Sequence, residues 1–361
     1  MNDANELISF IASMSGEGNL RVEENLGEGY VRLRVSEAER RQAKHDIQHV
    51  EDIVIEMLRN ARDAGADKVY LATTKEDGVR TLVFLDNGSG VPQDMQERIF
   101  DARVTSKLES MKLDRWGVHG RGMALFSIKQ NTDEARVVAS DVDLGSVFKV
   151  SVATDRLGER ADQSSWPQAV KDEDGHYVCA RGPHNIIRAA CEFALEELRA
   201  CDVYLGSPSE IAATLHAQAS SRLDASRLLF IDDDAELPVV DRLGLASDAE
   251  DFIRICSGLG LEMSERTAHR ILAGQIKPVR GVTARLLRER DSSSHASAPV
   301  DLAKDRRGLR VAKDDMAQFS RAVERDFNDL ASRYYLNLCG DPKIRVSRDR
   351  ITVTFDLAKE E

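Results

Sequence analysis

Residues 56–66 read EMLRNARDAGA, and this stretch decides the fold. It ends a longer pattern of apolar residues at three- and four-residue spacing, which is typical of a buried helix face: Ile47, Val50, Ile53, Val54, Met57, Leu58 and Ala61. Gly65 provides the left-handed residue with which many helices end. Glu56 and Asn60 are four residues apart and share one face of this helix, and Asp63 lies beside Asn60 on the next turn. The pattern therefore predicts a helix that holds a carboxylate and an amide in fixed register.

A carboxylate and an amide in this arrangement suit two kinds of role. They can act as a general base and as a ligand of Mg²⁺, because Mg²⁺ prefers oxygen ligands and keeps several of its waters. The same residues also fit a solvated helix face without any chemistry. The stretch alone leaves both interpretations open.

A second motif follows two expected strands. The runs KVYLAT at 68–73 and RTLVFL at 80–85 have the composition of strands and are joined by a turn that contains KEDG. Asp86, Gly88 and Gly90 come directly after the second run, in the sequence DNGSG. Locally, Asn-Gly predicts a hairpin turn. The same residues can instead form a nucleotide site, in which the carboxylate accepts a hydrogen bond from a purine amine and the glycines let the base lie against the backbone.

Glycines are frequent in the segment before the next expected helix. Residues 116–127 read WGVHGRGMALFS, so Gly117, Gly120 and Gly122 precede a helical run. The free N–H groups and the positive dipole end of such a helix suit a triphosphate. A glycine pattern of this kind is also common in flexible loops and is not specific by itself.

The order of the motifs is more specific than any one of them. The sequences E-x-x-x-N-x-x-D-A-G-A and D-x-G-x-G, then ARVTSK at 102–107 and the glycine-rich segment, resemble the Bergerat ATP-binding fold of the GHKL superfamily. That superfamily includes type II topoisomerase subunits, the ninety-kilodalton heat-shock chaperone, histidine kinases and MutL. The resemblance covers about residues 27–155 and is closest to MutL, followed by the B subunit of topoisomerase VI. It implies an α/β (α+β) fold with a Bergerat-type α/β sandwich. The sequence pattern after it predicts a mixed, mainly helical region that ends in a β pair.

The resemblance implies that these motifs bind ATP and Mg²⁺. Glu56 would orient the attacking water as general base, and Asn60 would ligate Mg²⁺. Asp86 would contact the adenine amine, with Gly88 and Gly90 under the base. The other residues that the resemblance assigns to nucleotide binding are Asp63, Thr105, Lys107, Gly117, Gly120, Arg121, Gly122 and Ser146.

Three functions are compatible with such a site. The resemblance favours a Mg²⁺-dependent ATPase that uses ATP binding and slow hydrolysis to change its conformation. One alternative is a non-enzymatic regulator, in which ATP only gates a partner interface. Another is a protein kinase of the histidine-kinase or anti-sigma type, since His45 precedes an acidic residue, as in a phosphoacceptor helix. By analogy with the superfamily, we expect a homodimer in the ATP-bound state.

The sequence predicts two domains. Residues 1–155 would form the ATP-binding domain and residues 176–361 a C-terminal effector region. The stretch between them is polar and irregular, as in a linker. Within the second region, residues 248–290 have the pattern of a helix-turn-helix.

This helix-turn-helix pattern is compatible with contact to duplex DNA. Ser264 would cap the second helix, and Arg266, Thr267 and Arg270 would face a DNA groove. Between residues 262 and 290, seven basic and three acidic side chains give a local charge of +4, which suits phosphates. An ordinary helical hairpin with a solvated basic face fits the same residues.

Composition limits the partners and the compartment. The formal net charge of −12 argues against general coating of polyanions, although it permits one local basic surface. Aromatic residues make up 5%, too few for large stacking surfaces on single-stranded nucleic acid. Five scattered cysteines without metal-ligand spacing indicate reduced thiols in a cytoplasmic protein. We expect no signal peptide and no membrane span.

Overall fold

The computed structural model describes residues 22–106, 112–119, 122–223, 231 and 233–287, together with 316, 319–320, 323–324, 327, 336–338, 340, 342–346 and 351–359. The chain divides into two compact units, residues 1–292 and 293–361. The sequence places a boundary between residues 155 and 176 instead. The arrangement of the first unit explains this difference.

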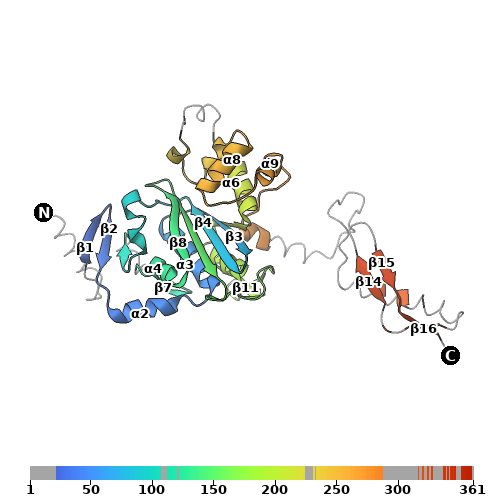
Figure 1. Cartoon of the computed structure of the whole chain (residues 1–361). Helices are drawn as coiled ribbons and strands as arrows, with labels where there is room; N and C mark the ends of the chain where they lie inside the picture. Colours follow the sequence, from blue (N-terminus) through green and yellow to red (C-terminus); the bar gives the residue numbers. More distant parts are fainter. Residues whose placement is uncertain are drawn as a thin grey trace. The chain divides into compact units, whose positions relative to one another are not determined.

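The first unit is built around a five-stranded sheet with the strand order β12-β3-β4-β9-β8 (Figure 1). Its strands are β3 (Lys68–Glu76), β4 (Val79–Asp86), β8 (Glu134–Ser140), β9 (Ser146–Ala153) and β12 (Asp202–Gly206). β12 pairs in parallel with β3, and all other neighbours in this sheet are antiparallel. The two strands predicted at 68–73 and 80–85 are confirmed as β3 and β4.

Side chains of the inner strands alternate between two hydrophobic cores. In β3, Val69 and Leu71 belong to the first core, whereas Tyr70 and Ala72 belong to the second. β4 repeats this alternation with Leu82 and Phe84 in the first core and Val83 and Leu85 in the second. Strands that are buried on both faces read as continuous apolar runs, which explains the sequences VYLA and LVFL.

Helices α3 (Val50–Asp63), α4 (Ala124–Asn131) and α5 (Ile186–Glu196) contribute to the first core and cover that face of the sheet. The helix predicted from the apolar pattern is confirmed as α3, and Gly65 follows it with φ of +75°, as expected at a helix end. α2 (Glu37–Asp46) packs against α4. A capping box formed by Ser36 and Glu39 fixes the start of α2.

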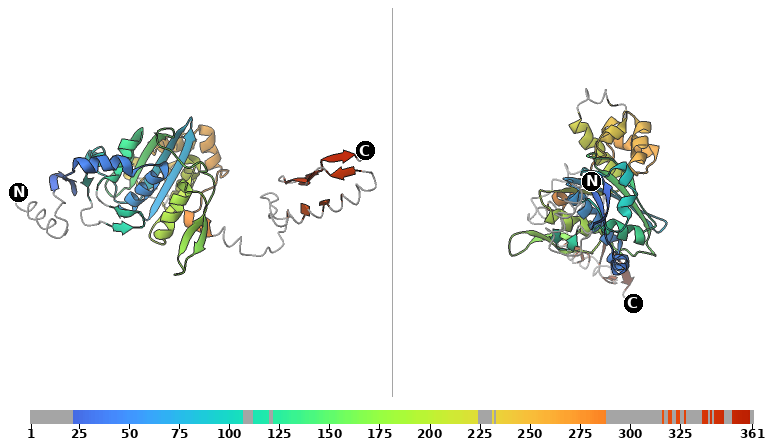
Figure 2. Two further views of the ribbon diagram at one scale, coloured as in Figure 1. Left: turned by 90° about the horizontal axis from the view of Figure 1, so that it is seen from below. Right: turned by 90° about the vertical axis from the view of Figure 1, so that its left-hand side faces the viewer.

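Helices α6 (Pro208–Arg222), α8 (Ala249–Gly258) and α9 (Glu265–Leu272) contribute to the second core, together with the short 3₁₀ helix η4 (Arg242–Leu245). These helices, yellow to orange in Figures 1 and 2, gather on one side of the sheet. The predicted α/β sandwich is therefore present, and its sheet carries a further helical layer on the other face.

Residues 276–287 pass from one face of the sheet to the other. Ile276 and Val279 pack against the second core, whereas Val282 and Leu286 belong to the first. The part of the chain after residue 176 thus completes both cores of the same sheet. For this reason the compact unit extends to residue 292 and does not end near residue 155.

Short elements surround the central sheet. A small antiparallel sheet consists of β1 (Val22–Gly27), β2 (Tyr30–Leu33) and β5 (Val104–Thr105). Two hairpins are formed by β6 (Lys112–Asp114) with β7 (Gly117–His119) and by β10 (Gln168–Lys171) with β11 (Tyr177–Arg181). The remaining 3₁₀ helices of the described residues are η1 (Gln93–Met95), η2 (Arg98–Phe100) and η3 (Asp234–Glu236).

The described residues of the second unit contain two antiparallel strand pairs. β13 (Leu336–Leu338) pairs with β16 (Leu357–Lys359), and β14 (Lys343–Val346) pairs with β15 (Ile351–Thr354). The β pair predicted at the end of the chain is confirmed as β14 and β15.

Two expectations from composition can be compared with the structure. Cys179, Cys191, Cys201 and Cys256 are buried free thiols, and Cys339 lies outside the described residues. Among the helices that the structure describes, none combines the length and the apolar character needed to cross a membrane.

Candidate functional site

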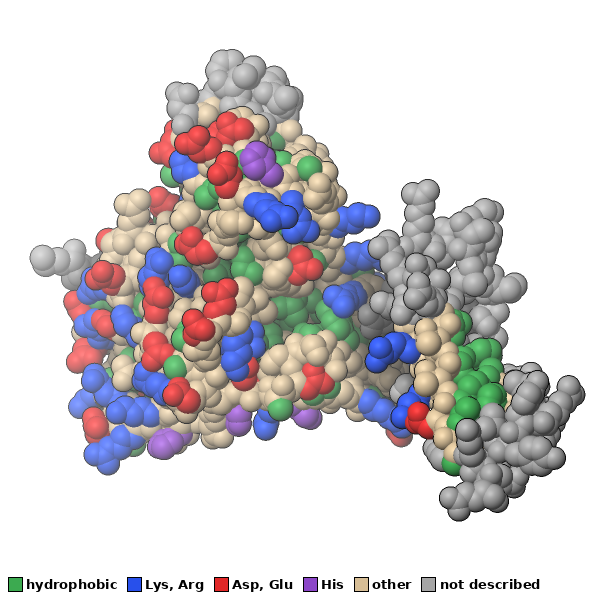
Figure 3. Space-filling view, turned by 45° about the vertical axis from the view of Figure 1, so that its right-hand side comes forward, with side chains coloured by type: hydrophobic (Ala, Val, Ile, Leu, Met, Phe, Trp, Pro, Cys, Tyr) green, Lys and Arg blue, Asp and Glu red, His purple; other side chains and the backbone are tan. Residues whose placement is uncertain are grey.

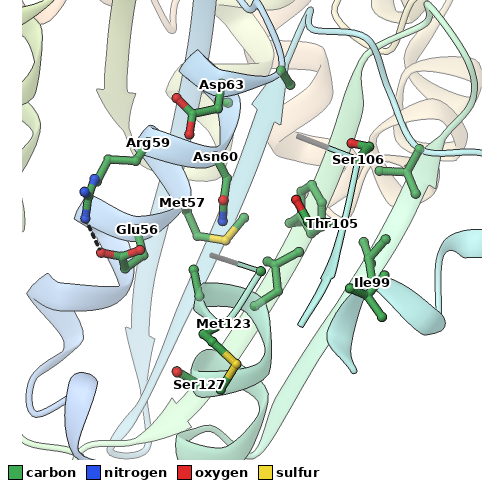
Figure 4. A pocket seen from close by; sticks show the side chains of 18 of the residues that line it. Glu56, Met57, Arg59, Asn60, Asp63, Ile99, Thr105, Ser106, Met123 and Ser127 are labelled. Carbon is green, nitrogen blue, oxygen red and sulfur yellow. Dashed lines mark hydrogen bonds and ion pairs between the residues drawn. The ribbon is translucent and has the colours of Figure 1, made fainter. Parts of the chain in front are cut away.

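The first face of the sheet is the one covered by α3, α4 and α5. A cavity of about 510 Å³ opens on this face. This volume lies in the range of small-molecule sites, roughly 300–1,000 Å³. Parts of α2, α3 and α4 form its wall with the ends of β4, β5 and β9 (Figure 4). The cavity brings together eight of the residues expected to bind a nucleotide: Glu56, Asn60, Asp63, Asp86, Gly90, Thr105, Gly122 and Ser146.

The other residues expected at a nucleotide site are not part of this wall. Gly88 packs against the end of α3, where an added Cβ would lie 2.8 Å from the carbonyl oxygen of Ala64. Gly117 is the first residue of β7. Lys107, Gly120 and Arg121 lie outside the described residues.

α3 presents three polar residues to the cavity because its opposite face is buried in the first core. In Figure 4, the side chains of Glu56, Asn60 and Asp63 follow one another along the helix, with Thr105 across the cavity from them. The side chain of Glu56 is 21% exposed, so its carboxylate is accessible to a ligand and to water. The spacing that predicted one shared helix face is thus realised in the structure.

Asp86, Ser89 and Gly90 of the sequence DNGSG line the floor of the cavity, and the stretch does not form a hairpin between neighbouring strands. Asp86 ends β4, is 4% exposed and accepts a hydrogen bond from the N–H of Gly88 at 2.8 Å. The side chain of Asn87 accepts from the N–H of Lys68 at 2.9 Å, which ties the turn to the start of β3. Gly90 has φ of +71°, and a Cβ there would overlap the carbonyl oxygen of Asp141. Glycine is therefore required at this position.

Ser146 lies beside Asp86 on the cavity floor. The register of β4 and β9 places the two residues directly opposite each other. Gly145, with φ of +78°, allows this approach, since a Cβ there would overlap the carbonyl oxygen of Asp86. The Oγ of Ser140 lies 3.1 Å from the Oγ of Ser146 and accepts from the N–H of Val91 at 2.8 Å. These contacts fix the polar floor.

The described wall carries more acidic than basic side chains. Arg103 is ion-paired with Glu39 from α2. The pKa of Glu39 is lowered, chiefly by a hydrogen bond from the backbone N–H of Ser36 and further by Arg103. Bound phosphates would therefore depend on a metal ion or on cations beyond this wall. The charged residues of the wall are Glu39, Asp46, Glu56, Asp63 and Asp86, against Arg59 and Arg103.

A buried ion-pair network next to the cavity was not anticipated from the sequence. Arg59 contacts Glu56 at 2.7 Å and Asp114 at 2.9 Å. Arg62 contacts Asp63 at 2.9 Å and both Asp114 and Glu197 at 3.1 Å. Arg59 and Arg62 follow Glu56 by three and six residues, so the helical spacing alone could have placed them near it. The contact with Asp114 joins residues 55 positions apart, for which the sequence holds no local signal.

The donor types of the cavity fit a Mg²⁺ ion that is shared with phosphates. The amide of Asn60 and the carboxylates of Glu56 and Asp63 offer oxygen atoms, which Mg²⁺ prefers. Within the described residues, no group of three or more His, Cys, Asp or Glu side chains is arranged to hold a metal by itself. Mg²⁺ usually binds through one or two protein ligands together with substrate phosphates and waters, so this donor set is adequate.

Comparison with known proteins agrees with this geometry. Residues 47–140 match the family described as histidine kinase-, DNA gyrase B- and HSP90-like ATPase. Residues 47–140 therefore match a GHKL-type ATPase domain. The chain is also similar to the DNA mismatch repair protein MutL of Staphylococcus aureus strains Newman and JH1, at 28% identity over 136 residues. These alignments cover 35% of this chain, which spans 20% of the length of each relative.

The match confirms the resemblance to the GHKL superfamily that the three motifs predicted. It covers α3, β3, β4, α4 and β8, and with them the residues Glu56, Asn60 and Asp86 of the cavity. The segments that form the second face of the sheet lie outside it.

The helices predicted in the helix-turn-helix pattern are present as α8 and α9. The side chain of Ser264 accepts a hydrogen bond from the N–H of Thr267, which confirms it as the cap of α9. Arg266 and Arg270 are exposed, and Thr267 is half-buried. α8 and α9 pack on the second face of the sheet, away from the cavity.

Proposed function

We propose that this chain binds ATP with Mg²⁺ in the cavity beside α3 and uses binding and hydrolysis to change its conformation. The observation that carries this proposal is the meeting of Glu56, Asn60 and Asp86 in one cavity, within the residues that match the ATPase family. Glu56 and Asn60 come from successive turns of α3, and Asp86 comes from the end of β4. A surface helix face would not explain why they converge with a strand end.

The polar floor would bind the adenine base. The carboxylate of Asp86 accepts hydrogen bonds and would take one from the exocyclic amine, while Ser146 lies next to it. Gly90 lines the cavity and lets the backbone pass close to the carbonyl oxygen of Asp141, which shapes the floor on which the base would lie. A hydrogen-bonding site of this kind discriminates against a base that lacks the amine, because the buried carboxylate would not gain that hydrogen bond.

Glu56 would act as the general base on the attacking water. Its carboxylate lies at the edge of the cavity, where water can reach it. Bound Mg²⁺, with Asn60 as a ligand, would neutralise charge on the phosphates. Asp63, Thr105 and Gly122 also line the cavity.

Phosphate release from ATP in the presence of Mg²⁺ tests this proposal. We expect turnover in the wild type and its loss, by roughly 100-fold or more, in Glu56→Gln. This variant retains an oxygen that can accept from Arg59, so ATP binding and folding should persist. Glu97→Gln, an exposed carboxylate outside the cavity, is the matched control and should behave as the wild type. Equal turnover in Glu56→Gln and in the wild type would rule out Glu56 as the base.

A second candidate is a regulator that binds ATP without hydrolysing it. The hydrogen bond between Glu56 and Arg59 favours it, because an oxygen of the proposed base is already engaged. In the same experiment, this candidate predicts ATP binding without phosphate release from the wild type. Label from γ-labelled ATP retained on the protein would instead indicate a protein kinase, and His45 is exposed on α2.

Duplex DNA is the partner that we propose for the second face. Arg266 and Arg270 point from α9 into solvent in a part of the chain with a local charge of +4. Figure 3 shows Lys and Arg side chains of the first unit interspersed with Asp and Glu side chains on the side that is turned forward. The similar relatives are named as DNA mismatch repair proteins. In this proposal, a homodimer formed in the ATP state would present two such surfaces to DNA.

A further inference from the structure

The ion-pair network beside the cavity links the proposed general base to a separate hairpin. The guanidinium of Arg59 is 3% exposed and donates to Glu56 Oε1 from Nη1 and to Asp114 Oδ2 from Nε. Asp114 is 6% exposed and is the last residue of β6. A buried guanidinium with two carboxylate partners has a fixed orientation, because a rotation that keeps one contact breaks the other.

Asp114 also determines the conformation of its own hairpin. Its Oδ1 accepts a hydrogen bond from the backbone N–H of Trp116 at 3.0 Å, within the turn between β6 and β7. Its Oδ2 accepts from Arg59 and from Arg62 on α3. One carboxylate thus shapes the turn and anchors it to α3. The ring of Trp116, which lines the cavity, stacks on Phe193 of α5, with the ring centroids 6.4 Å apart.

The hairpin is continuous with the glycine-rich segment that enters α4. β7 begins at Gly117, and Gly122 lines the cavity immediately before α4. A displacement of the hairpin from α3 would remove Asp114 from Arg59. The guanidinium of Arg59 would then keep its contact with Glu56 but lose the carboxylate that holds its Nε. The position of the hairpin and the orientation of the Glu56 carboxylate are therefore linked through one side chain.

We propose that Arg59 is a positioning residue that couples Glu56 to the hairpin of β6 and β7 through Asp114. The inference rests on the proposed function, in which Glu56 activates water. With the hairpin against α3, Asp114 holds Arg59, and Arg59 holds Glu56 toward the cavity. When the hairpin moves away, Glu56 loses its orientation while the adenine floor around Asp86 is unchanged. The rate of hydrolysis then depends strongly on the position of the hairpin, whereas the affinity for the nucleotide depends on it only weakly.

A double-mutant cycle on turnover tests this coupling. Asp114→Asn removes the charge but can still accept from the N–H of Trp116, and Arg59→Lys cannot hold two carboxylates in one fixed geometry. We expect each change to lower kcat by roughly 10–100-fold, with the Kd for ATP within about threefold of the wild type. Because the two residues act in series, the double variant should be no slower than the slower single variant. The proposal would be overturned if the fold loss of kcat in the double variant equalled the product of the two single losses. Unchanged kcat in both single variants would also overturn it.

Glu197→Gln is the matched control for this cycle. Glu197 contacts Arg62 at 3.1 Å and joins the same network through that residue. Its replacement removes one carboxylate of the cluster and should leave kcat as in the wild type. A loss of kcat equal to that of Asp114→Asn would show that the cluster acts only through its total charge, and it would contradict the specific role of Arg59.

Hydrogen exchange of the hairpin tests the coupling without turnover. Since coupling is reciprocal, Glu56→Gln should weaken the hold of Arg59 on Asp114 and speed amide exchange in peptides that cover residues 112–119. Unchanged exchange would overturn the coupling. Absence of phosphate release from the wild type, with this change in exchange still present, would instead overturn the proposed hydrolysis and leave the coupling intact.

Discussion

At the scale of single residues, two glycines determine the shape of the cavity floor. Gly90 and Gly145 both have positive φ, and a Cβ at either would overlap a backbone carbonyl oxygen. We expect Gly90→Ala and Gly145→Ala to lower the free energy of unfolding by about 1–3 kcal/mol from backbone strain, and by more from the overlap. Urea denaturation measures this loss. Gly258→Ala is the control, because a Cβ there meets no atom within 4 Å, and it should leave the free energy of unfolding unchanged. A loss equal to that of Gly90→Ala would contradict the explanation.

A largely buried carboxylate near the turn between β3 and β4 gives the stability a pH dependence. Burial raises the pKa of Glu159, but hydrogen bonds from Arg80 and Lys75 outweigh this and lower it overall. A group whose pKa is lower in the folded state stabilises the fold above its unfolded pKa, about 4.3 for Glu. This contribution is lost as the pH falls through the folded pKa.

Urea denaturation of Glu159→Gln should therefore show a pH-dependent deficit. We expect a constant loss of unfolding free energy above about pH 5 and a shrinking loss below about pH 4. Glu134→Gln is the control, because Glu134 and Arg136 form a largely exposed pair that contributes little. A deficit of Glu159→Gln that grows as the pH falls would have the wrong sign for this account.

The sequence predicted much of the candidate site but not what surrounds it. The spacing of Glu56 and Asn60 on α3 and the place of Asp86 after β4 are local features, so they could be recognised before the fold was known. The contact of Arg59 with Asp114 could not, because it depends on where a distant hairpin packs. The same applies to Glu39, which reaches the cavity wall only because α2 packs on α4.

At the scale of elements, periodicity identified helices and strands more readily than their partners. β3 and β4 were predicted correctly because burial on both faces makes them continuous apolar runs. The apolar faces of α6, α8 and α9 show that these helices pack against something, but not that they pack on the second face of the same sheet. The polar stretch after residue 155 resembles a linker, although Leu157 and Ala169 within it are buried in the first core.

α9 is the element that a DNA experiment should address. We expect binding of duplex DNA to weaken in Arg266→Ala/Arg270→Ala. The dependence of log K on log salt should also become shallower, by about 0.9 for each phosphate that the variant no longer neutralises. Fluorescence anisotropy at several salt concentrations measures both effects. Arg40→Ala/Arg41→Ala changes the charge equally at exposed positions of α2. Equal weakening in both double variants would mean that net charge and not α9 directs binding.

At the scale of the whole molecule, the sheet needs both helical layers. A chain that ends at residue 155 would expose Tyr70, Val83, Leu85 and Val147, which are buried in the second core. We expect this chain to show no cooperative unfolding transition, whereas residues 1–292 should unfold cooperatively by near-ultraviolet circular dichroism. Cooperative unfolding of the shorter chain would show that β3, β4, β8 and β9 form a stable sheet without α5, β12 and the second helical layer.

Calorimetric titration with ATP and Mg²⁺ tests the central claim most directly, because every proposed role depends on nucleotide binding. We predict that the wild type binds ATP and that Asp86→Asn, which can still accept from the N–H of Gly88, binds it at least about tenfold more weakly. Asp67→Asn, in the neighbouring turn but outside the cavity wall, should bind ATP as the wild type does. No heat of binding with ATP or ADP, or equal affinity in Asp86→Asn and the wild type, would contradict the account.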